Sequence, residues 1–358
     1  MQENLNIKYI YSWLIILKIK IKSYVKNIYF LRQFASINLL NNKFIVQRLN
    51  HYSDPKGSNI EQFDENFKQW LVGFTDGDGS FSITKNNTNW ILVYKISQHK
   101  YNIRILYYIK NKLNIGKINK EKKTNMVNYR ITKLEHIGKY IIPLFDKYPC
   151  LTSKQFNYLK FKEAYYILIN KDMSKEEKNS KLNILKLKIL SKLDYEYISP
   201  IWNNINKYNY SSILEYFENV INLDKNLWNE FNKKLSTLMN KNWIIGFIEA
   251  EGSFYIFKKD INRYEMGFGI TQKLDPHVLY SIKFLLYLDC KIRKKIKHNY
   301  YILDSCVKSD ILNIIDYFFY SMKGMKRFEF VIWRKCINKT NIEKLKIQTI
   351  LRNLKKNF

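Results

Sequence analysis

The chain has 358 residues, enough to bury a sizeable hydrophobic core and to form two or three domains. It carries 61 Lys and Arg against 31 Asp and Glu, a net charge of +30 that favours a nucleic acid or an anionic membrane as partner. The alternative explanation is codon bias, because the chain is rich in Lys, Asn, Ile and Tyr, as an AT-rich genome would produce. The four cysteines and five histidines lie at no metal-ligand spacing, which argues against a disulfide framework and a zinc site.

We expect residues 1–60 to form a loosely ordered N-terminal extension. The apolar run Tyr9–Leu17 is shorter than the roughly 20 residues that a membrane-spanning helix needs. The segment Ser53–Asn59, which reads SDPKGSN, has the composition of a linker. We therefore expect no stable membrane partner, and we place the first domain boundary after residue 60.

A twelve-residue block then occurs twice. Residues 70–81 read WLVGFTDGDGSF and residues 243–254 read WIIGFIEAEGSF, with the tryptophan, both acids and the last glycine in register. Later positions also repeat: Ile96–Gln98 with Ile270–Gln272, and Lys154 with Lys326. An ungapped block followed by matching anchors indicates a duplicated unit of about 100 residues.

Both copies predict the same order of helices and strands. Helical apolar spacing predicts a first helix over Phe67–Gly77 and over Trp243–Ala250, with Asp64 or Asn66, and Asn240, as N-caps. Alternating aromatic and β-branched residues then predict strands. The expected later elements are strands at 80–84, 90–98, 253–257 and 264–272, helices at Tyr101–Leu113 and Pro276–Leu288, strand pairs within Gly116–Thr132 and Lys291–Val307, helices at Leu134–Phe145 and Ser309–Tyr320, and last helices from Ser153 and Met325.

This order predicts an α+β fold with two pseudo-symmetric αββαββα halves. Each half is expected to form a curved antiparallel sheet, and the motif helices are expected to pair and join the halves. We place the halves at 61–195 and 237–358, with a linker at 196–236. Such a chain is expected to act as a monomer with internal pseudo-two-fold symmetry.

The motif helices carry small residues four positions apart, and residues at that spacing lie on one helix face. These small residues are Gly73, Gly77, Gly246 and Ala250. Small side chains allow two helix backbones to approach closely. Pairing on these faces would bring the C-terminal ends of both helices together.

The last helical position of each motif is an acid, Asp78 in the first and Glu251 in the second. Two carboxylates held a few ångströms apart repel each other and favour a divalent cation such as Mg²⁺ or Mn²⁺, with Gly77 and Ala250 as adjoining metal positions. Such a centre can hydrolyse a phosphodiester. One carboxylate per half can serve one strand each, which would let a single chain cut both strands of a duplex.

The motifs LVGFTDGDG at Leu71–Gly79 and IIGFIEAEG at Ile244–Gly252 resemble those of double-motif LAGLIDADG homing endonucleases. The resemblance covers most of residues 61–345. It implies a site-specific DNA endonuclease that makes a staggered double-strand break in a long asymmetric target and promotes mobility of its intron. It also implies an organellar gene and a mitochondrial location.

In that family the later acid of each motif is catalytic, which corresponds to Asp78 and Glu251. Glu251 is one methylene longer than Asp, so cleavage of one strand could be weaker. The earlier acids, Asp76 and Glu249, lie on a different helix face, and we interpret them as structural or solvent-exposed.

Four further positions match the family's active centre. Gln98 and Gln272 match a polar position that orients water or metal, although a strand-end glutamine can also contact solvent or a base. Lys154 and Lys326 match a basic residue that stabilises transition-state charge. In a chain this rich in lysine, a solvated surface role is the alternative.

The strands are expected to bind DNA in the major groove through a polar, basic face, with an affinity that falls steeply with salt. The candidate DNA-binding residues are Ser82, Thr84, Lys85, Asn87, Tyr94 and Lys95 in the first half, and Tyr255, Phe257, Lys258 and Arg263 in the second. The alternative for each is a solvated sheet face.

A second hypothesis is an RNA maturase, a relative of these endonucleases that assists splicing of its own intron. Loss of either motif acid would favour the maturase, and both Asp78 and Glu251 are present. Retention of the acids leaves a dual function open, because a chain with a net charge of +30 also binds RNA readily.

Overall fold

The computed structural model describes residues 64–121, 123–187, 198–204, 217 and 225–356. The expected N-terminal extension at 1–60 lies outside these residues, with its apolar run and its linker sequence, and so does most of the expected linker at 196–236. Within the described ranges, no helix is both long enough and apolar enough to cross a bilayer.

The first half begins with helix α2 (Glu65–Asp78), which the carboxylate of Asp64 caps by accepting a hydrogen bond from Asn66 N. The elements that follow α2 are β1 (Gly79–Asn86), β2 (Asn89–His99), η2 (Lys100–Asn102), α3 (Ile103–Leu113), β3 (Lys117–Lys120), β4 (Met126–Ile131), α4 (Leu134–His136), η3 (Ile137–Ile141), α5 (Ile142–Lys147), α6 (Lys154–Ile169) and α7 (Lys175–Leu187).

The second half begins with helix α10 (Lys241–Glu251), which Asn240 caps by accepting from Trp243 N. The elements before α10 are η5 (Pro200–Asn204) and α9 (Lys225–Leu238). Those after it are β5 (Ser253–Asp260), β6 (Arg263–Gln272), α11 (Pro276–Leu285), β7 (Arg293–Lys295), η7 (Ile296–His298), β8 (Tyr300–Ser305), α12 (Lys308–Phe318), α13 (Met325–Arg334) and α14 (Asn341–Lys356).

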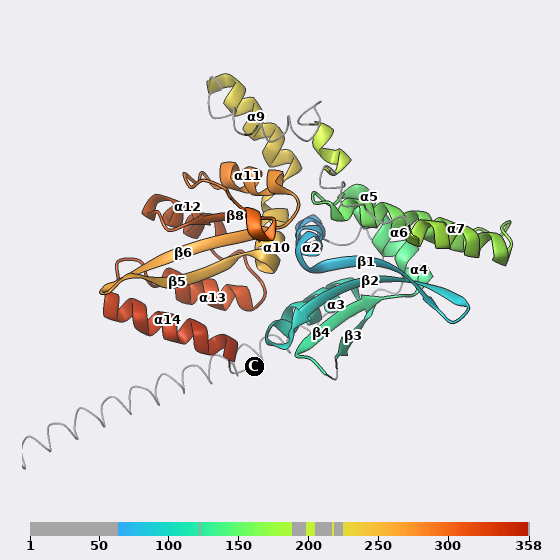
Figure 1. Cartoon of the computed structure of the whole chain (residues 1–358), viewed down its shortest axis with the longest axis horizontal. Coiled ribbons are helices and arrows are strands. Elements are labelled where there is room, and N and C mark those ends of the chain that lie inside the picture. Colours follow the sequence, from blue (N-terminus) through green and yellow to red (C-terminus); the bar gives the residue numbers. More distant parts are fainter. Residues whose placement is uncertain (1–63, 122, 188–197, 205–216, 218–224, 357–358) are drawn as a thin grey trace, which may run out of the picture. The chain divides into compact units, whose positions relative to one another are not determined.

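Each half contains one four-stranded antiparallel sheet, in the order β1-β2-β4-β3 and β5-β6-β8-β7. The predicted α+β fold with two repeated halves is therefore confirmed (Figure 1). Helices cover one face of each sheet: Phe81 of β1 packs on Phe145 and Phe161, and Phe254 of β5 packs on Phe330. The opposite face is free of these helices, and we call it the open face.

Two predicted helices differ from the structure, and one helix was not predicted. The helix expected at Leu134–Phe145 is interrupted by the π-helical turn η3 just before Pro143, because proline lacks the N–H that continues an α-helix. Helix α11 ends at Leu285 rather than Leu288, since Tyr287 adopts a left-handed conformation with φ of 53°. Helix α14 was not expected, and it packs on the second sheet, where Gln348 donates to Ile256 O.

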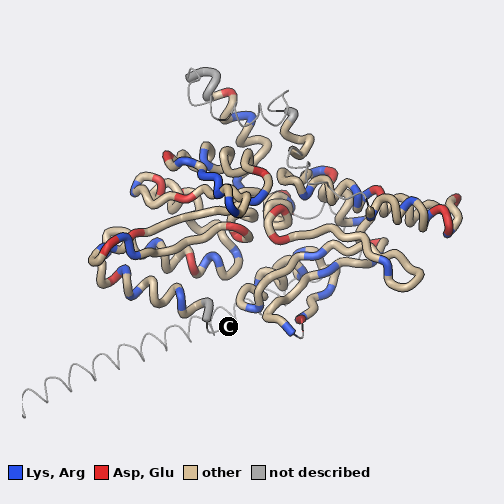
Figure 2. Tube along the Cα trace, viewed as in Figure 1, with Lys and Arg blue, Asp and Glu red and all other residues tan. Residues whose placement is uncertain are grey.

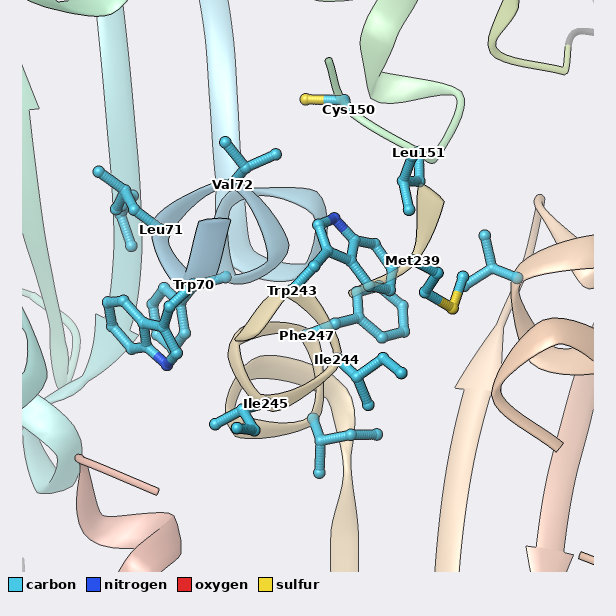
Figure 3. Packing of buried hydrophobic residues seen from close by; sticks show 14 of the residues in the cluster. Trp70, Leu71, Val72, Cys150, Leu151, Met239, Trp243, Ile244, Ile245 and Phe247 are labelled. Atoms are coloured by element: carbon cyan, nitrogen blue, oxygen red, sulfur yellow. The ribbon is translucent and has the colours of Figure 1, made fainter. Parts of the chain in front are cut away.

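Helices α2 and α10 pair through their small residues. A Cβ added to Gly73 would lie 2.0 Å from Trp243 O, and one added to Gly246 would lie 2.0 Å from Trp70 O. Such a distance leaves no room for any side chain, so the two backbones are in direct contact. Figure 3 shows the two paired helices, with the ring of Trp70 at the left of the pair and the ring of Trp243 at the right.

Candidate active site

The two later motif acids meet where α2 and α10 end. A Cβ added to Gly77 would lie 2.3 Å from Ala250 Cβ and 3.1 Å from Glu251 Cγ, so the second acid lies against the residue that precedes Asp78. Burial, and then the charge of Glu251, raises the pKa of Asp78 to about 6. Burial also raises the pKa of Glu251. The pairing of two repeated helices thus places one carboxylate from each half at a shared junction.

The two lysines lie at the same junction. Lys154 Nζ donates to Thr75 O at 2.9 Å and also to Gly77 O, and Lys326 Nζ donates to Gly252 O at 2.7 Å. These carbonyls belong to the C-terminal ends of the motif helices, where the helix dipole favours a cation. Burial lowers the pKa of Lys154, and the acids around it oppose that change.

The two glutamines differ. Gln98 Nε2 donates to Asp78 Oδ2, and Gln98 Oε1 accepts from Asn102 Nδ2 at 2.8 Å. Gln272 lies at the end of β6, half-buried, and its side chain makes no hydrogen bond within the part of the chain that the structure describes. Gln98 therefore contacts its acid through a hydrogen bond, whereas Gln272 makes none to Glu251.

The earlier motif acids, Asp76 and Glu249, bind the loops that precede α6 and α13. Asp76 accepts from Leu151 N at 2.8 Å and from Thr152 N at 3.3 Å. Glu249 Oε1 accepts from Lys323 N and Gly324 N, both at 2.6 Å. Both acids are buried, and this burial raises their pKa values. The structural interpretation of these acids agrees with the structure, and the solvent-exposed alternative is wrong.

A tryptophan from the opposite half completes each of these acid sites. Trp243 Nε1 donates to Asp76 Oδ2 at 2.9 Å, and Trp70 Nε1 donates to Glu249 Oε2 at 2.7 Å. In the sequence, the two tryptophans served only to align the two copies of the repeat, and their role as donors was not predicted. The available signal was their recurrence at the same position of both motifs, ahead of an acid that needs a buried donor.

The first sheet places some of the predicted DNA-binding residues on its open face. Ser82 and Lys95 face away from the helices, as does Thr84, because the strand partners alternate with those of the core. Asn87 occupies the turn between β1 and β2, with φ of 53°. Lys85 pairs with Trp90 on the helix-covered side.

Tyr94 was assigned to DNA binding, and this assignment is wrong. The ring is fully buried on the helix side, and its hydroxyl shares a 2.7 Å hydrogen bond with Thr75 Oγ1 of α2. The strand alternates strictly, so Tyr94 lies on the opposite face from its neighbour Lys95. It anchors β2 to the motif helix instead.

The second sheet presents a different open face. Tyr255 and Phe257 lie on it with ring centroids 5.9 Å apart, and a Cβ at Gly267 would lie 2.2 Å from the Tyr255 ring. Glycine therefore leaves room for the ring to lie across β6. Lys258 alternates to the helix-covered side. Arg263, at the hairpin, is 3.2 Å from Asp260 and pairs with it.

Two repeated halves, two open sheets and a shared pair of carboxylates define a pseudo-symmetric α+β protein with one composite centre. The family model for LAGLIDADG endonuclease matches residues 71–165 and 244–337, the same two segments that carry these features. The chain belongs to this family.

Relatives and solved structures agree with this assignment. The chain is 38% identical to a probable intron-encoded endonuclease, Cox1-I1b, of Schizosaccharomyces pombe, over 82% of this chain and 70% of that protein. It is 33% identical to the uncharacterized mitochondrial protein RF1 of Saccharomyces cerevisiae, over 73% of this chain and 46% of that protein. The fold is similar to I-SmaMI bound to an uncleaved DNA target, with a TM-score of 0.59 and 24% identity over 81% of this chain and 98% of that one.

A second solved structure is similar to the same extent. The LAGLIDADG meganuclease I-AabMI, bound to uncleaved DNA, has a TM-score of 0.58 and 20% identity over 81% of this chain and 98% of that one. At these identities the likeness concerns the fold alone.

Proposed function

We propose that this protein is a homing endonuclease, which makes a staggered double-strand break in a long asymmetric DNA target and promotes mobility of its intron. The observation that carries the proposal is the meeting of Asp78 and Glu251 at the ends of paired helices. Burial raises the pKa of both acids, and the charge of Glu251 raises that of Asp78 further, so their ionised forms cost stability. Acids held in such an unfavourable setting are often functional. Its membership of an endonuclease family, with relatives named as intron-encoded endonucleases, supports the same function.

We further propose that the centre binds Mg²⁺ or Mn²⁺. The donors at the junction fit these cations because they are all oxygens: the carboxylates of Asp78 and Glu251 and the last carbonyls of the two helices. Among the described residues, no group of three His, Cys, Asp or Glu side chains could hold a metal alone, so phosphate and water would complete the ligand set. When bound, the cation supplies positive charge to the phosphate oxygens during hydrolysis.

The proposed roles of Gly77 and Ala250 at the metal differ. The Gly77 carbonyl already accepts from Lys154 Nζ, so it offers a cation only its second lone pair. The equivalent lysine, Lys326, binds Gly252 O instead, which leaves the Ala250 carbonyl free of it. We therefore expect Ala250 to be the more available of the two.

The protein's own groups prepare the hydrolysis. Water adds to a backbone phosphorus, one phosphorus–oxygen bond breaks, and the leaving oxygen gains a proton. Lys154 and Lys326 hold positive charge at the junction, where negative charge grows on the phosphate. Gln98 holds the carboxylate of Asp78 by donating to Oδ2, which fixes the direction of the other oxygen.

The open faces of the two sheets are the proposed DNA-binding surfaces. Their polar residues would contact phosphates and base edges along the major groove. Similar folds have been solved on uncleaved DNA targets, which supports this placement. We also propose a mitochondrial matrix location, because relatives include a mitochondrial protein and intron-encoded endonucleases of fungi.

The test is cleavage of the intronless host-gene sequence in a supercoiled plasmid. Purified protein with Mg²⁺ should convert the plasmid to linear DNA, and EDTA should prevent this. The double variant Asp78→Asn with Glu251→Gln should bind the same DNA without cutting it. A wild type that cuts nothing but stimulates splicing of its own intron RNA would replace this proposal with the maturase function.

A further inference from the structure

Two residues at equivalent positions of the halves reach across the junction. Asn102 is the N-cap residue of α3 and Asp275 is that of α11, and neither side chain caps its own helix. Short polar residues at this position usually do so. Instead, Asn102 Oδ1 accepts from Met325 N at 2.9 Å, and Asp275 Oδ1 accepts from Ser153 N at 2.8 Å. Each contact lies at the start of a helix of the other half, α13 for Asn102 and α6 for Asp275.

After these contacts, the two side chains differ in the hydrogen bonds that they can still form. Asn102 uses its Nδ2 to donate to Gln98 Oε1, and Gln98 Nε2 donates to Asp78. Asp275 uses its second oxygen to accept from Ser153 Oγ at 2.9 Å. Both carboxylate oxygens of Asp275 thus accept from Ser153, whereas the amide of Asn102 accepts with its oxygen and donates with its nitrogen. Only the first half therefore has a continuous relay from the opposite half to its acid.

The direction of this relay is fixed at both ends. The N–H of Met325 can only donate, so Asn102 must present its oxygen there and its nitrogen to Gln98. Gln98 then accepts with Oε1 and presents Nε2 to the carboxylate of Asp78, which accepts when ionised. Asn102 is 8% exposed and Gln98 is 9% exposed, so water offers little alternative. The amide of Gln98 thus has one favourable orientation.

We infer that Asn102 is a positioning residue, which orients Gln98 toward Asp78 and makes the Asp78 centre the faster of the two in cutting its strand. This inference rests on the proposed endonuclease function. At the Glu251 centre, Gln272 makes no hydrogen bond within the described residues, and Asp275 cannot orient it in the same way. The Asn and Asp at these equivalent positions would set an order of strand cleavage.

The test is a strand-resolved nicking assay on a target with differently labelled strands. Asp78→Asn and Glu251→Gln first assign each strand to its centre. Asn102→Asp keeps the acceptor for Met325 N but presents a second acceptor to Gln98, so the amide must turn its nitrogen away from Asp78. We expect the strand assigned to Asp78 to be cut about tenfold more slowly, with a much smaller effect on the other strand.

Three controls separate positioning from folding and from charge. Melting temperatures of Asn102→Asp and wild type should agree within a few degrees. Asn102→Asp should add nothing to Gln98→Leu, because a residue that acts through Gln98 has no further effect once Gln98 is lost. The reciprocal Asp275→Asn should not slow the strand assigned to Asp78. Equal slowing of both strands, or full additivity with Gln98→Leu, would overturn the inference.

A second measurement needs no DNA. In protein labelled with ¹⁵N-glutamine, the side-chain amide of Gln98, assigned through Gln98→Leu, should show the downfield proton shift of a hydrogen bond to a carboxylate. Both Asn102→Asp and Asp78→Ala should remove this shift. A wild type that fails to cut DNA but shows the shift refutes the proposed function and keeps the relay. A Gln98 amide signal that is the same in wild type, Asn102→Asp and Asp78→Ala refutes the relay alone.

Discussion

The two halves share one fold but treat charge differently. On the first open face, Lys95, Lys117 and Arg130 occupy neighbouring paired positions, and none of the three forms an ion pair within the described residues. On the second, three basic residues form ion pairs with acids of the same sheet: Lys259 with Glu265, Arg263 with Asp260 and Arg293 with Asp304. Figure 2 shows the acids and bases together at the hairpin of β5 and β6.

The two motif helices, in contrast to the two sheets, are nearly equivalent in their contacts. A Cβ at Gly73 or at Gly246 would lie at the same distance from a facing carbonyl oxygen. The earlier acid of each motif, Asp76 or Glu249, accepts a hydrogen bond from a tryptophan of the other half. Direct contact between two backbones requires glycine at the contact, whereas a sheet face exposed to solvent accommodates many side chains. After duplication, the halves could diverge in what they contact but not in how they pair.

The largest expected effect concerns the two acids. Asp78→Asn and Glu251→Gln should each remove most cleavage of one strand, by about 10³-fold or more, because each removes one carboxylate ligand of the proposed cation. Supercoiled plasmid should accumulate as nicked circles with either variant. Gel analysis of the two labelled strands measures this. Loss of both cuts in either single variant would show that the halves share one centre rather than serve one strand each.

The next effect tests whether the helix pair is as symmetric as it looks. Gly73→Ala and Gly246→Ala should both destabilise the fold by about 3 kcal/mol or more, since an added methyl overlaps a backbone carbonyl that cannot move alone. Urea unfolding measures the change. Gly269→Ala is the matched control, because its Cβ would meet no atom closer than 3.4 Å. A large difference between the first two variants would contradict equal packing.

Much of this helix pair could be read from the sequence. Small residues four apart predict a close helix contact, and an acid before each closing glycine places two carboxylates at its end. The order of elements followed from alternation and from the repeat. These features are local, or recur at a fixed offset, so a single sequence contains them.

The parts that could not be predicted depend on contacts between distant residues. The alternation of β2 separates Tyr94 from Lys95, but which face meets the helices depends on α5 and α6. The hydrogen bond from Met325 N to Asn102 Oδ1 joins two residues that are far apart in the chain and belong to different halves. Trp202, in the linker, donates to Leu151 O at 2.7 Å, and nothing in its local sequence signals that contact.

A smaller effect links the centre to pH. The pKa of Asp78 in the folded protein is about 6, above the ordinary value of 3.8, so the fold favours the protonated acid. Its contribution to stability is complete below pH 3.8 and is lost as pH rises through about 6. At pH 8, Asp78→Asn should therefore be more stable than wild type, by about 3 kcal/mol, and equally stable near pH 4.

Cleavage should change in the opposite direction, because Asp78 acts as a carboxylate and is ionised only above about pH 6. Rates measured from pH 5 to pH 8 should rise through that value, while the stability advantage of Asp78→Asn grows over the same range. A stability difference that does not vary with pH would show that Asp78 is not held in its protonated form.

The smallest effect returns to the open faces. Arg130→Gln should weaken binding to the DNA target several-fold and lower the slope of log affinity against log salt by about one. The reason is that the Arg130 side chain, which has no ion pair within the described residues, is free to neutralise a phosphate. Arg293→Gln should change the slope less, since Arg293 already lies 2.7 Å from Asp304. Dissociation constants at several salt concentrations measure both slopes. Equal slopes for the two variants would mean that Arg293 leaves Asp304 for the DNA, and that the charge difference between the halves exists only in the unbound protein.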